Sequence, residues 1–307
     1  MSAASTRGKI LVIRGGAIGD FILTLPALAA LRGQFPQAHL EVLGYPHIVQ
    51  LAEAGGLVDR VQPIEARGLA SFFARNGELP EDLRDYFSEF NIIVSYFYDP
   101  DEIFQTNVKR CAPGQFIVGP HRPDETDKTH ATEVYLKPLE RLAIFGADAV
   151  PRLRLASQPS TPITQLALHP GSGSERKNWP EHLWAELSAQ LLATTDVNLL
   201  LVGGEAEGDR LQKLAAALPP TRCMVARNLP LVELGRRLQT CVGFVGHDSG
   251  ITHLAAAVGL SCVVLWAHTV EEIWRPQGPR VQILREHSGL HNLSVARVLA
   301  ALRPVCE

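Results

Sequence analysis

The sequence predicts an α/β protein with two domains, each built around a parallel sheet. Short apolar runs of strand length alternate with longer amphipathic segments along most of the chain. The alternation lapses once, over the polar, proline-containing stretch Ala156–Gln165, and then restarts. Such alternation is typical of parallel sheets with helices on both faces. We therefore expect domains at 1–156 and 157–307, with a linker at the lapse.

The composition indicates a soluble globular protein. Of the 307 residues, 46% are apolar and 20% are charged, and the net charge of -3 gives no basic field that would attract nucleic acid. The five cysteines form no C-x-x-C pair, which argues against a zinc site and fits a reducing cytoplasm. No stretch resembles a signal peptide or reaches the roughly 18 apolar residues of a membrane span. We expect a cytoplasmic protein with no nucleic-acid partner and, at most, contact with a membrane face.

The first predicted domain opens with a buried strand and a helical segment. The strand is Lys9–Arg14, and the helical pattern continues through Leu31. Pro26 either kinks this helix or begins its longer part, with Thr24 as the cap, because proline disrupts a helix interior. The remaining predicted elements are strands at Leu40–Leu43, Val58–Ile64 and Asn91–Ser95 and a helix at Thr129–Phe145.

The second predicted domain repeats the alternation with five strands. Its helices are expected at Pro180–Leu192, which a proline opens at a first-turn position, and at Glu205–Leu218. The strands are expected at Leu166–His169, Asn198–Val202, Cys223–Ala226, Val242–Val245 and Cys262–Trp266.

The segment "GFVGHDSGITHLAAAVG" in this second domain suggests an anion site. A strand runs into it, and either Asp248 or Ser249 can cap the helix that follows. Gly250 lets the backbone approach a ligand closely, and His253 lies one turn further on. The unpaired N–H groups at such a helix end favour an anion, with diphosphate as the natural candidate. An ordinary capped helix remains the alternative.

Two further loops follow predicted strands of the same domain. "HPGSGSERKNWP" offers Ser172, Gly173 and Ser174 as small donors and Lys177 as a cation, unless it is only a solvated loop. Glu205, after "LLLVGG", can accept hydroxyls of a ribose or sugar, or it can cap the next helix. Because the carboxyl ends of parallel strands share one edge, we expect the three loops to converge there on one ligand. None of them matches the Walker pattern.

The first loop of the chain, "VIRGGAIGD", does not fit a dinucleotide site. Aligning Gly16 and Gly19 with the last two glycines of G-x-G-x-x-G places Arg14 where the first should stand. The second strand ends in Gly44 rather than in an acid that could hold a ribose, which also argues against a nicotinamide dehydrogenase. Asp20 would repel a pyrophosphate beside it, so it is either a helix cap or a general base.

Three stretches together resemble a known family. "ILVIRGGAIGDFILTLPALAALRGQFP", "LALHPGSGSERKNWPEHLWAEL" and "GHDSGITHLAAAVG" are similar, in order, to signatures of glycosyltransferase family 9, the bacterial lipopolysaccharide heptosyltransferases. The resemblance covers roughly residues 9–285. It implies the GT-B fold, in which two Rossmann-like domains with parallel sheets face each other across a cleft. The first takes the acceptor and the second the nucleotide-sugar, and "LSVARVLAALRPV" could cross back to the first domain.

The resemblance also implies roles for individual residues. Asp20 matches the family's catalytic aspartate, and Glu205 the acid near the donor's ribose or sugar. The positions that match the donor phosphate site are Ser172, Gly173, Lys177, Asp248, Ser249, Gly250 and His253. The implied reaction is an inverting sugar transfer that needs neither a metal nor a bound cofactor, and no D-x-D element occurs near the donor motifs.

The implied partners are a nucleotide-sugar donor, expected to be ADP-heptose, and a glycan or glycolipid acceptor, either of the lipopolysaccharide core or a related glycan. A lipid-linked acceptor would bring the protein to the cytoplasmic face of the inner membrane. The chain departs from the family at Ala267–Gly278, where a "G-P-T-D-P" type turn is common, and at His247, which replaces a frequent asparagine. A GT-B sugar-nucleotide epimerase and a non-catalytic nucleotide-sugar binding protein remain as alternatives.

Overall fold

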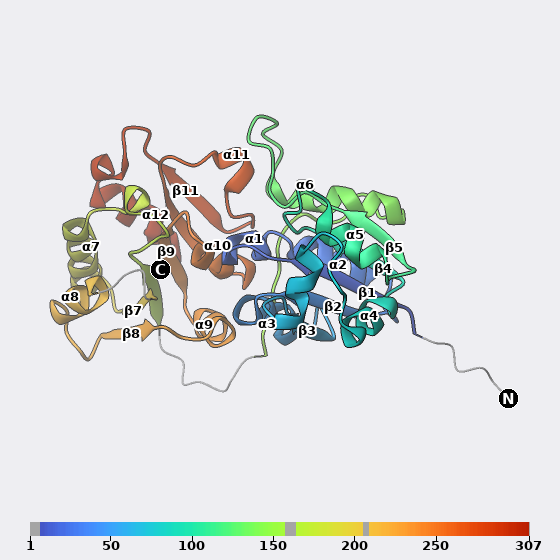
Figure 1. Ribbon diagram of the computed structural model, residues 1–307. Helices are drawn as coiled ribbons and strands as arrows, with labels where there is room; N and C mark the ends of the chain where they lie inside the picture. Colours follow the sequence, from blue (N-terminus) through green and yellow to red (C-terminus); the bar gives the residue numbers. More distant parts are fainter. Residues whose placement is uncertain (1–6, 157–163, 205–208, 307) are drawn as a thin grey trace. The chain divides into compact units, whose positions relative to one another are not determined.

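The computed structural model describes residues 7–156, 164–204 and 209–306, and it divides the chain into two compact units, Met1–Ala149 and Val150–Glu307 (Figure 1). Each unit contains one sheet in which every strand pair is parallel. The α/β class predicted from the alternation, with two parallel sheets, is therefore confirmed.

The first unit has a five-stranded sheet in the order β3-β2-β1-β4-β5. The strands are β1 (Lys9–Arg14), β2 (His39–Gly44), β3 (Arg60–Pro63), β4 (Ile92–Ser95) and β5 (Gln115–Val118). The helices are α1 (Ile18–Ile22), α2 (Leu25–Gln34), α3 (Pro46–Ala54), α4 (Glu81–Ser88), α5 (Ile103–Lys109) and α6 (Ala131–Leu136), with 3₁₀ turns η1 (Arg67–Phe73) and η2 (Lys137–Leu142).

The second unit has a six-stranded sheet in the order β11-β10-β9-β6-β7-β8. The strands are β6 (Gln165–His169), β7 (Asn198–Gly203), β8 (Cys223–Arg227), β9 (Gly243–His247), β10 (Ser261–Trp266) and β11 (Val281–Arg285). The helices are α7 (Glu181–Thr194), α8 (Arg210–Ala216), α9 (Leu231–Leu238), α10 (Gly250–Ala257), α11 (Glu271–Trp274) and α12 (Val295–Cys306), with 3₁₀ turns η3 (Glu175–Lys177) and η5 (Leu290–Asn292).

Two proline positions explain how the predicted helices divide. Pro26 lies in the first turn of α2 and Thr24 is the N-cap, so the first helical pattern breaks into α1 and α2 at the expected place. The helix predicted over Thr129–Phe145 becomes α6 followed by η2, because Pro138 lies in the first turn of η2 and Ala143 ends it with a φ of 56°.

The second unit begins earlier in the chain than the sequence predicts. The Leu153 N–H donates to the Ala257 carbonyl at 2.8 Å, and Leu153 and Leu155 are both buried. The units divide between Ala149 and Val150, whereas the sequence places the division after residue 156. The predicted linker at 156–165 lies mostly outside the described residues.

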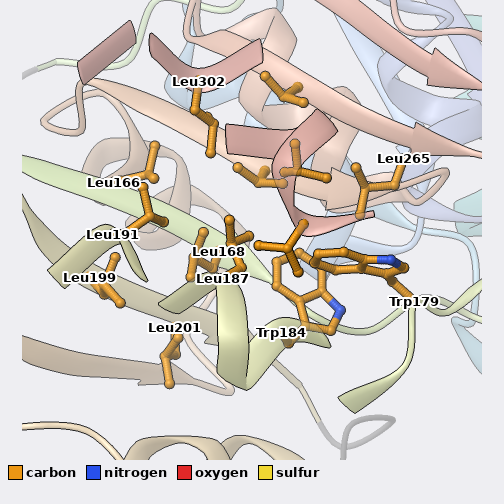
Figure 2. Close-up of a cluster of buried hydrophobic side chains, with 14 of the residues drawn as sticks. Leu166, Leu168, Trp179, Trp184, Leu187, Leu191, Leu199, Leu201, Leu265 and Leu302 are labelled. Carbon is orange, nitrogen blue, oxygen red and sulfur yellow. The ribbon is translucent and has the colours of Figure 1, made fainter. Parts of the chain in front are cut away.

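The core of the second unit is a cluster of leucines packed around Trp179 and Trp184 (Figure 2). The indole rings of these two residues meet edge to face, with centroids 5.3 Å apart. Helix α12 adds Val298 and Leu302 to the same cluster and packs on α7 and β10. The structure therefore assigns the carboxy-terminal helix to the second unit. Among the described residues no helix has the length and apolar character of a membrane span.

Candidate active site

In the first unit, a glycine-dependent turn brings Asp20 to the carboxyl edge of the sheet. The chain leaves β1 through Gly16, whose φ of 96° favours glycine, and a Cβ there would lie 3.0 Å from Asp20 Oδ2. Asp20 is the third residue of α1, and its Oδ2 accepts the Ala17 N–H at 3.1 Å. The side chain remains 29% exposed. Asp20 therefore caps α1 and leaves Oδ1 available for other chemistry.

The Arg14 guanidinium is buried directly behind this turn. It is the last residue of β1 and is 2% exposed. It donates to the carbonyls of His121 (2.9 Å), Asp20 (3.2 Å) and Tyr96 (3.4 Å). Its Nη2 is 4.0 Å from Asp20 Oδ1, and its Cζ lies 4.5 Å from the ring centroid of Tyr135. One cation thus fixes loops from β1, β4 and β5 around Asp20.

In the second unit, the start of α10 forms the centre of the predicted phosphate site. Ser249, not Asp248, is the N-cap, and its hydroxyl accepts the Thr252 N–H. Gly250 is the first helical residue, so no side chain shields the backbone there. The Ser249 hydroxyl also lies 3.3 Å from Nδ1 of His169, the last residue of β6. His253 is buried one turn further along.

Asp248 holds Lys177 beside this helix start. The Lys177 ammonium is 2.6 Å from Asp248 Oδ2, and the same oxygen accepts the Thr269 hydroxyl. The lysine remains about one-third exposed, whereas the aspartate is mostly buried. Because the two charges offset each other, the positive end of the α10 dipole is the remaining source of positive field at this point. Asp248 serves as a support for Lys177.

The loop after β6 keeps its shape through Ser172. Its hydroxyl lies 2.7 Å from the Ser174 carbonyl and 2.8 Å from Asn178 Oδ1, so it is occupied within the loop. A Cβ at Gly173 would meet no atom within 4 Å, which leaves the backbone at that position open to a ligand. Glu205 lies outside the described residues.

His247 joins the two ends of this loop, a role that the sequence did not reveal. It is the last residue of β9 and is completely buried. Its Nε2 accepts the Trp179 N–H at 2.7 Å, and its Nδ1 lies 3.1 Å from the Gly171 carbonyl, which requires a proton on Nδ1. An asparagine side chain also offers one acceptor and one donor, so His247 preserves the chemistry of the residue it replaces. The sequence signal that could have revealed this role is a polar residue at the end of a buried strand.

The structure thus brings Ser249, Gly250, Asp248 and Lys177 together in the second unit, and it places Asp20 in the first. Within the described ranges, no group of three or more His, Cys, Asp or Glu side chains could hold a metal ion. Arg14, His169 and His247 were not among the predicted site residues, and only their contacts in the structure connect them to the site.

We expect Arg14→Met to destabilise the first unit, because three carbonyls would lose their donor. The free energy of unfolding should fall by about 2–3 kcal/mol, measured by urea denaturation followed by circular dichroism. Arg84→Met, at an exposed arginine of the same unit, is the matched control and should change little. Equal effects of the two substitutions would contradict the role assigned to Arg14.

We expect the second unit to lose stability as the pH falls below about 6.5. Burial lowers the pKa of His169 to about 4 and that of His247 to about 3 from an ordinary 6.5. In that window the unfolded chain takes up protons that the folded unit excludes. Stability is therefore full above 6.5 and decreases by up to about 1.4 kcal/mol per pH unit for each histidine.

Urea denaturation at pH 7 and pH 5 tests this, with tryptophan fluorescence as the signal because all four tryptophans lie in the second unit. His247→Asn should reduce the loss between the two pH values. His182→Asn, at an exposed histidine of the same unit, should leave it unchanged. A loss that His247→Asn does not alter would refute the assignment.

Comparison with known proteins identifies the family. The model of glycosyltransferase family 9 (heptosyltransferase) matches residues 144–299, more than half of the chain. Lipopolysaccharide heptosyltransferase 1 of Pseudomonas aeruginosa is 24% identical over 289 residues, covering 85% of this chain and 79% of that protein. Lipopolysaccharide heptosyltransferase 3 of Escherichia coli is 21% identical over 292 residues, covering 84% and 82%.

A solved structure of E. coli ADP-heptose lipopolysaccharide heptosyltransferase II matches 97% of this chain and 98% of its own, with a TM-score of 0.79 and 18% identity. At that identity the likeness establishes the fold, which is GT-B. The three signatures, the two parallel sheets and the family match agree: this chain belongs to glycosyltransferase family 9, the heptosyltransferase family, and is a glycosyltransferase.

Proposed function

We propose that the protein transfers a heptose from ADP-heptose to a hydroxyl of a lipopolysaccharide-core or related glycan, with inversion at the anomeric carbon. The donor and the acceptor class come from the names of its relatives. The observation that carries the proposal is the accessible Asp20 carboxylate, held in place by a buried guanidinium at a sheet edge. A glycolipid acceptor would place the protein at a membrane face, which follows from the proposed acceptor alone.

Asp20 is proposed as the general base. Its Oδ2 is occupied by the Ala17 N–H, so Oδ1 is the oxygen that would accept the proton of the attacking hydroxyl. The Arg14 contact to the Asp20 carbonyl fixes the backbone at this residue, which keeps the carboxylate oriented during the reaction.

The departing ADP is proposed to leave from the second unit. Negative charge grows on the diphosphate as the glycosidic bond breaks, and the N–H groups at the start of α10 together with Lys177 would stabilise it. These groups provide a positive field from the protein itself, which supports transfer without a metal ion. The proposal requires that the donor held by one unit and the acceptor bound by the other meet in a shared reaction volume.

We expect Asp20→Asn to lower turnover by about 10²- to 10⁴-fold, because the amide can still cap α1 but cannot take a proton. Release of ADP would be followed with ADP-heptose and O-deacylated lipopolysaccharide from a heptose-deficient strain as substrates. Binding of ADP, measured by isothermal titration calorimetry, should not change. Turnover near the wild-type value would remove the base assignment, and conversion of the donor without any acceptor would favour an epimerase.

We expect Lys177→Ala to raise the Kd for ADP by about ten- to a hundredfold. The substitution removes a cation and also leaves the Asp248 carboxylate uncompensated beside the diphosphate. Calorimetry in EDTA measures the effect, with Lys177→Arg retaining most of the affinity. Lys213→Ala, at an exposed lysine of the same unit, should bind ADP normally. Unchanged affinity in Lys177→Ala would contradict its phosphate role, and loss of transfer in EDTA would contradict metal independence.

A further inference from the structure

An exposed aromatic pair lies at the carboxyl edge of the first sheet. After β4 the chain places Tyr96 in the core, where its hydroxyl donates to the Tyr135 carbonyl at 2.6 Å. Two residues later Tyr98 is 61% exposed. Its ring centroid is 4.5 Å from that of His121, with the planes 58° apart. A large aromatic ring held in solvent by a second ring is a candidate contact surface for a ligand.

The pair lies at the position in the sheet where ligands bind in open α/β folds. In the order β3-β2-β1-β4-β5 the chain first proceeds outward from β1 to β3 and then resumes on the other side of β1 with β4. The loops after β1 and β4 therefore flank the point where the strand order reverses, which is where open α/β folds bind ligands. The loops are in contact here, since a Cβ at Gly15 would lie 3.7 Å from the Phe97 ring. Tyr98 lies in the loop after β4, and His121 lies in the loop after β5, the neighbouring strand.

One guanidinium connects the aromatic pair to Asp20. Arg14 donates to the His121 carbonyl at 2.9 Å and to the Asp20 carbonyl at 3.2 Å, so the two residues are fixed to a common buried group. Burial, followed by the charges of Arg14 and Arg122, lowers the pKa of His121, and the Asp20 charge acts in the opposite direction. The imidazole is therefore neutral near pH 7 and presents an aromatic face beside Tyr98.

We propose that Tyr98 and His121 form the surface on which a pyranose ring of the acceptor stacks, beside Asp20. The C–H groups on one face of a pyranose match the negative face of an aromatic ring, while the sugar hydroxyls stay free at its rim. This inference rests on the proposed transferase reaction and assigns acceptor residues to the first unit. Because Arg14 binds the backbone of both His121 and Asp20, we expect a sugar stacked on this pair to lie at the same edge of the sheet as Asp20.

Saturation-transfer NMR with the O-deacylated heptose-deficient lipopolysaccharide, in the absence of donor, tests the contact directly. We expect transfer to the sugar ring protons with the wild-type protein and its loss in Tyr98→Ala. Tyr98→Phe, which keeps the ring and removes the hydroxyl, should retain the signal. Phe145→Ala removes an aromatic ring of the same unit that is 69% exposed, and it should also retain the signal.

Steady-state kinetics supplies the second measurement. Tyr98→Ala and His121→Ala should each raise KM for the acceptor by about tenfold, with KM for ADP-heptose unchanged. A signal and an acceptor KM that Tyr98→Ala leaves intact would overturn the proposal, as would the absence of any wild-type signal. Failure of the transferase proposal appears differently: the wild-type protein would then bind the oligosaccharide through Tyr98 but release no ADP.

Discussion

The buried guanidinium of Arg14 is the interaction on which the amino-terminal site depends. A charge that is almost fully removed from water is tolerated only where hydrogen bonds replace its hydration. Here three backbone carbonyls accept from the two Nη atoms and the ring of Tyr135 covers the guanidinium, while Nε is buried without a hydrogen-bond partner among the described residues. Tyr96, His121 and Tyr135 all lie far from Arg14 in the sequence. The requirement to satisfy one cation therefore fixes the loops after β1, β4 and β5 relative to one another, and the Asp20 turn with them.

The second unit uses the same device with a neutral group. His247, like Arg14, is the last residue of a central strand and is directed into the loops beyond the sheet edge. Its Nε2 accepts the Trp179 N–H, and its Nδ1–H donates to the Gly171 carbonyl, so the ring bonds to both ends of the loop between these residues. A buried polar side chain is costly when it is left unpaired, so the loop is held in the conformation that pairs it. In both units a polar residue at a strand end organises a loop that carries predicted site residues.

The segment Ala267–Gly278, where the sequence departs from the family, is nevertheless bonded to a residue of the predicted phosphate site. The Thr269 hydroxyl donates to Asp248, and the Thr269 carbonyl accepts the Trp266 indole N–H at 2.9 Å. The turn that replaces the family's usual motif thus supports Asp248, and through it Lys177. The residues of this loop differ from those usual in the family, but the loop still donates a hydrogen bond to the carboxylate that positions Lys177.

The sequence by itself determined the α/β class, the central strands, the α1–α2 break at Pro26 and the residue types around Asp20 and Ser249. These features are local: apolar runs, helix caps and glycines act within a few residues of one another. The edge strands β5 and β11 were not predicted, although the edge strands β3 and β8 were. The apolar run of β5 is only three residues long, and Gln282 interrupts that of β11. The tertiary structure alone decided that Arg14, 107 residues away from His121 in the chain, joins that residue to Asp20, and that His247 closes a loop 76 residues away. Such pairings arise when burial forces a polar group to find whichever partner the packed chain brings near it, and no pattern along the chain records that partner.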